Sequence, residues 1–566
     1  MLRPAPPRER IARSDRHTRP ALAALALVAL VAGAAGPADA GPSPQRTVRI
    51  RVASKGQPNG ASANAQISGD GQYVAFETAA TNLGPADPNG HVRDVYLYDG
   101  KSGAIRLLSA PDGGAGADGA SSAPTISADG GAVAFTSLAT NLVPRASNVT
   151  PDVAPHRDVF AWSRSGGLQQ VSVSAAQVPA DGDSAEPGIS ADGQRVVFSS
   201  TAGNLVDGHP DGQRDVYLRD LGTAQTVLIS ATQDGQPGDG ESSAPAISPD
   251  GRYVSFATKA TNLVPGTTLH GWNVVLRDLT TGATELVSVS SSGAAQRGGP
   301  PPATPPLSDL SDGARYVVFE SGATNLVHGD TNHRTDIFRR DRLLKRTVRA
   351  SLATTDQQPD GGSSAPSLSA DGRYLTFLSR APNLTPGQPR GTDVFIRDLV
   401  AHTTVLAEVS SSGRARSGEQ AGNVAQRPSS ADDGSTTVFV SSARNLVTGK
   451  TSRLPDVFLR RLFPAPITVA SRSAALSRGH VVVTFVSVDR QAGPLLCRLD
   501  HQARAICPLG SVVLPLLKPG KHLLIAFAGG PGSAYAARPT RVRIVVKRGG
   551  RARVHVTNPG AAIGFG

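Results

Sequence analysis

The chain has 566 residues, of which 61 are Gly and 43 are Pro, so it is long enough for more than one domain and a large total core. Its formal net charge is +12 at pH 7, and only 8 of its 57 basic residues are Lys. A GC-rich genome would produce that preference for Arg, so the preference is no evidence for a particular chemistry.

The net charge is unevenly distributed along the chain. Residues 463–566 carry fourteen basic residues against two acidic ones, whereas residues 41–462 carry 37 basic and 40 acidic residues. The long middle region is therefore close to neutral, and the basic character belongs to the C-terminal region.

Residues 1–40 have the pattern of a signal peptide. Six Arg residues precede a run of small and apolar residues from Ala21 to Ala35, and Ala38-Asp39-Ala40 fits a small-x-small cleavage site. The apolar run is shorter than the roughly 20 residues that cross a bilayer, and no later stretch could span a membrane. We expect a secreted or cell-envelope protein with no transmembrane segment in the mature chain. An uncleaved anchor is the alternative.

One sequence unit recurs seven times in residues 41–462. Its fourth copy begins Ile247-Ser-Pro-Asp-Gly-Arg-Tyr-Val-Ser-Phe, continues Ala-Thr-Asn-Leu-Val-Pro, and then Asn273-Val-Val-Leu-Arg-Asp. A complete unit holds four short strand candidates, and an Asp-Gly hairpin signal separates the first two, because Gly accepts positive φ readily. Four antiparallel strands repeated seven times predict an all-β chain with a seven-bladed β-propeller. The Asp-Gly pairs begin at Asp70, Asp129, Asp192, Asp250, Asp312, Asp371 and Asp433.

The pattern Ser-x-Asp-Gly-x-x-Val-x-Phe resembles the WD40-like PD40 repeat of TolB-type propellers. The longer unit, with Ala-Thr-Asn-Leu-Val-Pro and Asp-Val-Phe-x-Arg-Asp, is similar to repeats of secreted actinobacterial proteins of that group. The resemblance covers about residues 47–462 and implies the propeller fold. The chain departs from TolB in having seven units instead of six and in lacking its N-terminal domain, so TolB's partners are not carried over.

The seventh unit stops after Asp456-Val-Phe-Leu-Arg-Arg461 and lacks a fourth strand. Thr47 to Ala53 alternates apolar and polar residues and is a spare strand at the other end of the repeats. We predict that it completes the last blade, which leaves no open sheet edge. Ile467 to Ser471 is the alternative closing strand.

Residues 463–566 form a second unit, with strand-like segments between His480 and Thr557. The runs Leu496-Cys-Arg-Leu-Asp, Cys507-Pro and Lys518-Pro-Gly-Lys-His resemble a bacterial immunoglobulin-like domain, which implies a small β-sandwich with two Cys on adjacent strands. Cys497 and Cys507 are the chain's 2 cysteines. An even count after an export signal favours a disulfide between them, and two free thiols are the alternative.

Three repeat positions are occupied by the same residue type in all or nearly all units, which favours a structural role. Phe packs between sheets, and Asn or Asp side chains tie a loop to backbone groups. The positions are Phe76, Phe135, Phe198, Phe256, Phe319, Phe377 and Phe439; Asn82, Asn141, Asn204, Asn262, Asn325, Asn383 and Asn445; and Asp94, Asp158, Asp215, Asn273, Asp336, Asp393 and Asp456.

The loops between the second and third strands lie on one face of a propeller and carry histidines in five consecutive units. We predict a ligand or partner face there, with ordinary solvated loop residues as the alternative. Trp272, where other units have Arg or Thr, is a further contact candidate, although packing is favoured for it. Fragments that resemble calcium loops begin at Asp87 and Asp330 but lack the full ligand set, so no metal site is predicted. The predicted face comprises His91, His156, His209, His270, Trp272 and His333.

The sequence carries no Gly-x-Ser-x-Gly elbow, no His-Glu-x-x-His and no phosphate loop, so no catalytic residue and no cofactor are predicted. A site assembled from several blades would leave no local motif. The C-terminal hairpin concentrates six basic residues, which could meet an anionic envelope polymer; a solvated face is the alternative. Export and the lack of interleaved aromatic residues argue against nucleic acid. The basic residues are Arg541, Arg543, Lys547, Arg548, Arg551 and Arg553.

These patterns favour a non-catalytic scaffold that binds a protein or glycan partner in the cell envelope or exterior. The alternative is a propeller enzyme, a hydrolase or lyase acting on polysaccharide or peptide with residues drawn from several blade loops. Clustered carboxylate and His side chains in the channel would favour the enzyme, and a channel of Ser, Ala and Gly would favour the scaffold.

Overall fold

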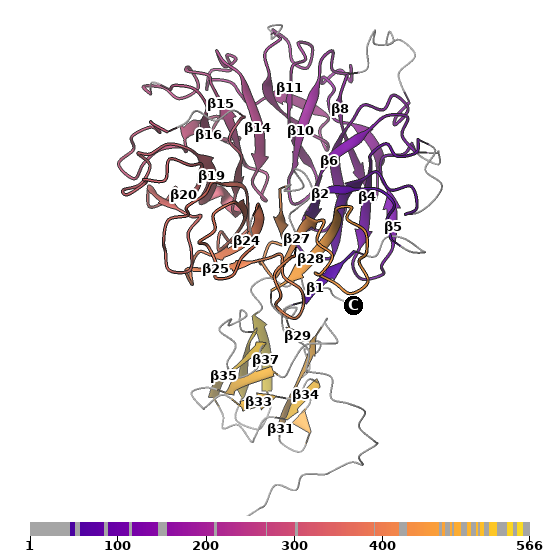
Figure 1. The fold of residues 1–566 in the computed structure, drawn as a ribbon, viewed down its shortest axis with the longest axis vertical. Helices are drawn as coiled ribbons and strands as arrows, with labels where there is room; N and C mark the ends of the chain where they lie inside the picture. Colours follow the sequence, from indigo (N-terminus) through magenta and orange to yellow (C-terminus); the bar gives the residue numbers. More distant parts are fainter. Residues whose placement is uncertain are drawn as a thin grey trace, which may run out of the picture. The chain divides into compact units, whose positions relative to one another are not determined.

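The computed structural model describes residues 46–50, 57–83, 89–111, 116–144, 156–208, 212–267, 269–299, 304–389, 391–417 and 427–462, together with individual strands between 467 and 557. Within 46–462, the described residues form seven four-stranded antiparallel sheets arranged radially around one axis (Figure 1). The innermost strands of neighbouring sheets contact one another all the way round, including the first and the last. The predicted seven-bladed propeller is therefore confirmed.

Each of the first four blades is a meander in chain order. Blade 1 consists of β2 (Ser62–Ile67), β3 (Tyr73–Thr78), β4 (Asp94–Asp99) and β5 (Ile105–Leu107); blade 2 of β6 (Ser121–Ile126), β7 (Ala132–Ser137), β8 (Asp158–Ser163) and β9 (Gly167–Gln170); blade 3 of β10 (Ser184–Ile189), β11 (Arg195–Ser200), β12 (Asp215–Asp220) and β13 (Gln225–Leu228); and blade 4 of β14 (Ser242–Ile247), β15 (Tyr253–Thr258), β16 (Asn273–Asp278) and β17 (Thr284–Leu286).

The remaining blades follow the same plan except at the closure. Blade 5 consists of β18 (Ser308–Leu310), β19 (Tyr316–Ser321), β20 (Asp336–Asp341) and β21 (Arg346–Arg349); blade 6 of β22 (Ser363–Leu368), β23 (Tyr374–Ser379), β24 (Asp393–Asp398) and β25 (Thr403–Leu406); and blade 7 of β26 (Ser429–Ser430), β27 (Thr436–Ser441), β28 (Asp456–Arg461) and β1 (Arg46–Arg49).

The N-terminal strand β1 closes the propeller, as predicted. It pairs antiparallel with β28, with Thr47 opposite Arg460 and Arg49 opposite Phe458. The alternative closing segment forms β29 (Ile467–Val469), which pairs with β31 (His480–Ser487) instead. Because the two ends of the repeat region share one sheet, blade 7 has no missing outer strand.

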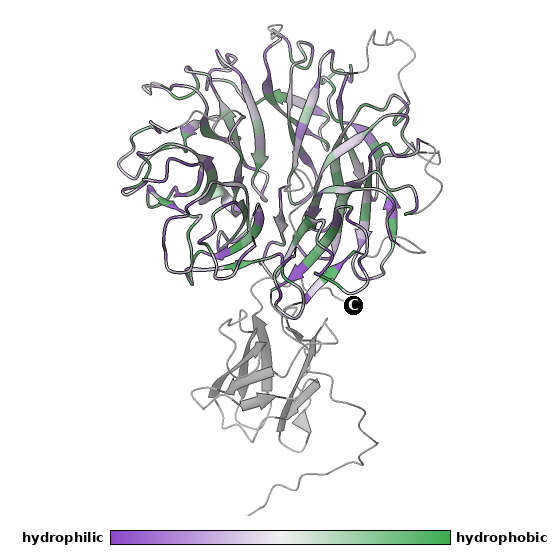
Figure 2. Cartoon of the chain, viewed as in Figure 1, coloured by the Kyte–Doolittle hydropathy of each residue, from purple (hydrophilic) through white to green (hydrophobic). Residues whose placement is uncertain are grey.

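Among the described residues, seven hydrophobic clusters form a ring in which each lies between two neighbouring sheets, and a small eighth cluster surrounds Trp272. The cluster at the closure combines Phe76 and Val74 of blade 1 with Val438, Val457 and Leu459 of blade 7. The repeated Phe of the second strand is buried in every blade. Burying such a side chain contributes about 1.5–3 kcal/mol, so its recurrence stabilises every interface between blades. Figure 2 shows many hydrophobic residues along these strands.

A shared turn links the first two strands of most blades. In blade 4 the Ser248 hydroxyl donates to Asp250 and accepts the N–H of Tyr253, while Gly251 has a φ of 70°. Only Gly adopts that φ without a steric cost, which explains the recurrent Asp-Gly.

Blade 5 departs from the prediction that Asp312-Gly313 forms the same turn. Ser311 accepts the N–H of Tyr316, as its equivalents do, so Gly313 takes the place of the usual Asp and Ala314 takes the place of the usual Gly, with a φ of 47°. The segment Asp312–Ala314 forms a short 3-10 turn, η1. Asp312 therefore stands one position earlier in the turn than the other aspartates.

Two further sheets lie in the C-terminal region. One joins β29, β31, β30 (Leu476–Ser477) and β34 (Gly510–Val513); the other has the order β33 (Ala505–Cys507), β32 (Leu495–Leu499), β35 (Gly520–Ala528), β36 (Thr540–Val546) and β37 (Ala552–Thr557). The all-β prediction is confirmed for these strands, and the immunoglobulin-like assignment stays a prediction.

Candidate functional site

The central channel takes residues from all seven blades. Within the described residues it contains a cavity of about 170 Å³, small enough to suit one polar group or the tip of a longer ligand. Most of its lining is small or apolar. One row, at the end of each innermost strand, consists of Ile67, Ile126, Ile189, Ile247, Leu310, Leu368 and Ser430.

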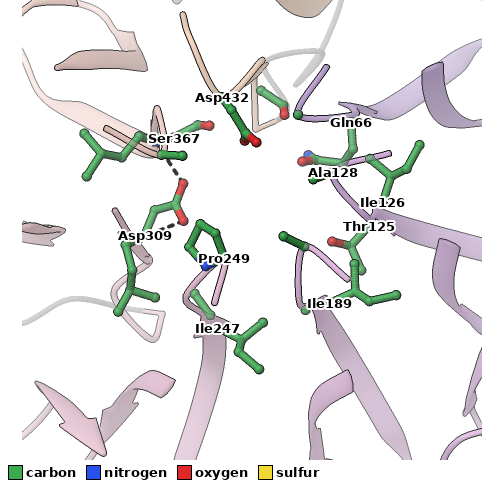
Figure 3. A pocket seen from close by; sticks show the side chains of 18 of the residues that line it. Gln66, Thr125, Ile126, Ala128, Ile189, Ile247, Pro249, Asp309, Ser367 and Asp432 are labelled. Atoms are coloured by element: carbon green, nitrogen blue, oxygen red, sulfur yellow. Dashed lines mark hydrogen bonds between the residues drawn. The ribbon is translucent and has the colours of Figure 1, made fainter. Parts of the chain in front are cut away.

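Charged side chains enter the channel from blades 5 and 7. Asp309 stands where the other blades have Gln66, Thr125, Gly188, Ala246, Ser367 and Ser429. Asp432 stands in the turn position that holds Gly or Ala in four other blades. Arg427 completes the charged lining. Figure 3 shows the Asp309 and Asp432 carboxylates directed toward the cavity.

Asp309 is held by backbone groups of two blades. Its Oδ1 accepts the N–H of Leu310 at 2.9 Å, and its Oδ2 accepts the N–H of Leu368 in blade 6 at 2.9 Å (Figure 3). Burial raises the pKa of this carboxyl, and the nearby Arg427 and the two N–H groups oppose that rise. The side chain is thus fixed in place by its hydrogen bonds.

Asp432 is less constrained, and it accepts no hydrogen bond from any described residue through its side chain. It packs over Gly69, whose missing side chain leaves room for the carboxylate. Asp432 is exposed to the channel, yet desolvation by the surrounding protein and the neighbouring carboxylates of Asp433 and Asp70 raise its pKa to about 6. This carboxyl can therefore hold or release a proton close to neutral pH.

Arg427 provides the positive charge of the site. Its Nη2 donates to the carbonyl of Ser308 at 2.8 Å, which places the guanidinium beside Asp309. It also lies near the half-buried Glu320, whose carboxylate accepts the N–H groups of Ala365 and Leu307. Burial raises the pKa of Glu320, and Arg427 opposes it. The channel can accordingly offer a cationic or hydroxyl-bearing group two carboxylates and one cation.

The predicted loop residues are not brought together at one point. His91, His270 and His333 are exposed, and His156 is half-buried, each in the loop of its own blade. His91 bonds through Nδ1 to the carbonyl of Ala79 at 3.0 Å, and His209 lies outside the described residues. Among the residues described, no group of three His, Cys, Asp or Glu side chains could hold a metal ion.

Trp272 is buried, with 8% of its surface exposed, so its indole does not serve as a contact on the open face. It packs against Ala244, Ala257 and Leu307, and Lys259 lies 4.5 Å from the ring centre. These neighbours come from blades 4 and 5 and cover the ring, which corrects its placement among the exposed loop residues.

The repeated asparagines have the structural role that their recurrence favoured. In all seven blades, the Asn Oδ1 accepts a backbone N–H and Nδ2 donates to a backbone carbonyl of the segment that enters the same blade. Asn262, for example, accepts from Asp239 at 3.1 Å and donates to Pro237 at 3.0 Å. The other six pairs of bonds are those of Asn82, Asn141, Asn204, Asn325, Asn383 and Asn445.

The two calcium-loop fragments are also tied into the frame. Asn89 and Asn332 each donate to the first Asp of their third strand and to a backbone carbonyl. Asp330 pairs with the buried Arg349 at 2.8 Å. These side chains stabilise the loops of blades 1 and 5.

For the predicted residues of the C-terminal region, the structure gives the strands to which they belong and the pairing of those strands. β32 and β33 are adjacent, with Cys497 opposite Ala505 and Cys507 opposite Leu495, so the cysteines stand two register positions apart. Arg541 and Arg543 belong to β36 and Arg553 to β37, which pair as a hairpin. Lys547, Arg548 and Arg551 lie outside the described residues. The described part of the chain contains no helix with the length and apolarity of a membrane crossing.

No family model matches the sequence, and comparison with curated proteins gives no match. Similar solved structures include TolB from Acinetobacter baumannii (14% identity, TM-score 0.33, 70% of this chain and 79% of that one) and a putative TolB from Agrobacterium tumefaciens (16%, 0.31, 54% and 83%). An oligogalacturonate lyase from Vibrio parahaemolyticus is also similar (11%, 0.41, 74% and 93%). At these scores the likenesses add nothing to what the strand pairing shows.

Asp309, Arg427 and Asp432 were missed by the sequence predictions. The available signal was their departure from the repeat: each breaks a column that is otherwise mostly small or uncharged. Aligning the innermost strands and comparing the columns would have found them.

Proposed function

We propose that the protein is an exported, non-catalytic scaffold that binds a protein or glycan partner in the cell envelope or exterior. The observation that carries this proposal is the pair of backbone hydrogen bonds made by the repeated Asn of each blade, from Asn82 to Asn445, which we call the Asn clamps. The seven clamps fix the base of every loop on one face. The loop tips beyond the clamps differ between blades and expose His91, His270 and His333. A rigid frame that carries variable, exposed loops is the usual construction of a recognition surface.

The basic C-terminal hairpin supports a second contact within the same role. We infer that Arg541, Arg543 and Arg553, with the neighbouring basic residues, hold an anionic envelope polymer by charge attraction. Retention of the chain on such a polymer should weaken steeply with added salt, because exposed charges are screened within about 8 Å at physiological ionic strength. Retention that is unchanged between low and high salt would contradict this contact.

A test of the scaffold compares three forms of the chain on envelope extract and on purified envelope glycans. The first is the unchanged chain, the second has His91, His156, His270 and His333 changed to Ala, and the third has Asp309→Asn and Asp432→Asn. We expect one partner to be retained by the first and third forms and lost, by roughly ten-fold or more, from the second. Equal capture by all three forms would contradict a loop-face partner.

The enzyme alternative is favoured by one observation, the pair of channel carboxylates. Desolvation inside the channel raises the pKa of both Asp309 and Asp432, to about 6 for Asp432, which is the range of a general acid or base. The channel otherwise consists mainly of small and apolar residues, so its lining matches neither the enzyme nor the scaffold expectation completely. Cleavage of a polysaccharide or peptide by the unchanged chain, abolished by Asp432→Asn, would establish the enzyme in place of the scaffold.

A further inference from the structure

The turn between the third and fourth strands is built in the same way in blades 1 to 6, which makes its tip residues directly comparable. In blades 1, 3, 4, 5 and 6 the Asp that ends the third strand accepts a backbone N–H from the turn. In each of the six turns, the residue after the tip pair has a positive φ. The two tip residues are Lys101-Ser102, Ser165-Gly166, Gly222-Thr223, Thr280-Thr281, Leu343-Leu344 and Val400-Ala401.

Blades 5 and 6 are neighbours, and they alone among these six carry bulky apolar residues at the tip. Leu343 is 72% exposed, Leu344 is 65% exposed and Val400 is 67% exposed. None of the three belongs to a hydrophobic cluster of the described residues. The fold does not require them, because the same turn forms with Thr280 and Thr281 in blade 4.

Basic residues surround the leucine tip. Lys345 and Arg346 follow it, both are exposed, and neither forms an ion pair with a described residue. Asp341 stands opposite Arg346, but its carboxylate is engaged by Arg315 and by the N–H of Leu344. Arg342 is paired with Glu285. The free charge beside Leu343 and Leu344 is therefore positive.

The shape of this surface argues for a particular kind of partner. A two-residue hairpin tip is convex, so it can enter a soft layer but cannot enclose a peptide, which needs a groove. Protein interfaces depend mainly on Trp, Tyr and Arg anchors, and Leu is under-represented among them. Exposed aliphatic residues flanked by Lys and Arg are the composition that inserts at the boundary of an anionic bilayer.

We propose that the turn tips of blades 5 and 6 form a membrane-contact edge, in which Leu343, Leu344 and Val400 enter the interface of an anionic lipid bilayer. Lys345 and Arg346 attract the lipid head groups. The contact is peripheral and reversible, because three aliphatic side chains and two cations bury little surface. It holds the propeller by its rim and leaves the clamped loop face for other contacts.

Fluorescence quenching by brominated lipid tests the proposal at the turn itself. The full chain is prepared as Leu343→Trp and, as a matched control, as Thr280→Trp at the same turn position in blade 4. The two native Trp residues are buried in both variants, and the unchanged chain gives their baseline. We expect anionic brominated vesicles to quench Leu343→Trp by roughly two-fold at low salt and to leave Thr280→Trp near baseline.

Three results would overturn the proposal. Leu343→Trp could remain unquenched by anionic vesicles, which would leave a protein partner as the occupant of this edge. Thr280→Trp could be quenched equally, which would show adhesion without a preferred edge. Neutral vesicles could quench Leu343→Trp as strongly as anionic ones, which would remove the role of Lys345 and Arg346.

A second measurement uses vesicle flotation of the full chain. The double variant Leu343→Ser, Leu344→Ser should reduce the fraction of the chain that floats with anionic vesicles, roughly by half or more. Val227→Ser, which removes a 44% exposed apolar residue elsewhere, is the control and should bind like the unchanged chain. Because residues 1–40 are common to all forms, differences between them report on the turn.

Discussion

The carboxylate of Asp432 in blade 7 occupies the space that a side chain on Gly69 in blade 1 would need. The two residues also share a backbone bond, from the N–H of Asp432 to the carbonyl of Gly69 at 3.0 Å. A channel carboxylate is thus accommodated by a glycine 363 positions away in the chain, at the junction that closes the propeller.

This relationship predicts coupling between the two positions. Gly69→Ala should cost about 1–2 kcal/mol in the unchanged chain, because the new methyl group displaces the carboxylate. In an Asp432→Ala background the same change should cost nothing or stabilise slightly, since the unfolded chain loses entropy when Gly becomes Ala. Urea unfolding of the four proteins in this cycle measures the coupling. Strictly additive effects would show that the two side chains do not compete for space.

The Asn clamps make a separate prediction about stability. Asn383 accepts the N–H of Asp360 at 3.0 Å and donates to the carbonyl of Gln358 at 2.9 Å. Asn383→Ala removes both bonds and should lower the free energy of unfolding by about 1–3 kcal/mol. Asn383→Asp keeps the acceptor but cannot donate, so we expect it to lower the free energy of unfolding by less than Asn383→Ala does. Unfolding in urea would rank the three, and an Ala variant as stable as the parent would contradict the clamp.

Much of the fold could be predicted because it depends on local pattern. The period fixed the number of blades, the hairpin signal fixed the first turn, and the missing strand after Arg461 pointed to β1. Blade 5 was predicted wrongly at Asp312-Gly313, because an Asp-Gly pair there is shifted by one residue. The hydrogen bonds that Ser311 makes with Tyr316 and Ala314 reveal the true register.

The channel could not be predicted in the same way. Asp309 and Asp432 come from blades 5 and 7, and the closed ring brings both to one cavity. No local pattern encodes that meeting. Packing was favoured for Trp272 from the sequence, but its partners could not be named, since Leu307, which helps to cover it, belongs to the next blade.

The closing strand gives a third prediction. Thr47 is buried; its Oγ1 donates to the carbonyl of Val409 and accepts from Nη1 of Arg460, the latter at 3.0 Å. Thr47→Val should lower the free energy of unfolding by about 1–3 kcal/mol, because buried polar groups of blades 6 and 7 lose a partner.

Thr404→Val is the matched control, since Thr404 makes the same bonds with Leu352 and Arg397 within the continuous chain. We expect the two variants to lose similar stability. Only Thr47→Val should speed amide hydrogen exchange in β1, because β1 is held to β28 by hydrogen bonds and not by a connecting turn. Equal exchange in β1 for both variants would indicate that Thr47 has no special part in closure.

The last prediction concerns pH and Glu408 of blade 6. Blades 1 to 5 have Ser at this position, whereas Glu408 is fully buried beside Asp393 and Arg416. Its Oε2 accepts the hydroxyl of Ser441 in blade 7 at 2.9 Å. Burial, and then the charge of Asp393, raise the pKa of Glu408 to about 8, while Arg416 opposes the rise. Asp393, whose pKa burial also raises, titrates together with it.

Between pH about 4.5 and 8 the folded chain holds a proton on Glu408 that the unfolded chain has released. The unfolded state binds fewer protons there, so the free energy of unfolding falls as pH rises through this window and levels off above it. Glu408→Gln cannot ionise and retains hydrogen-bonding groups of similar shape. Relative to the parent, it should gain stability on the order of 3 kcal/mol between pH 5 and 8.

Urea unfolding of both proteins at several pH values measures this difference. The control is Glu241→Gln, because Glu241 is exposed and paired with Lys259 at the surface, where an ion pair contributes little. Its stability should follow that of the parent at every pH. If the curves of Glu408→Gln and the parent also ran parallel from pH 5 to 8, Glu408 would not hold the proton that the folded chain retains in this window.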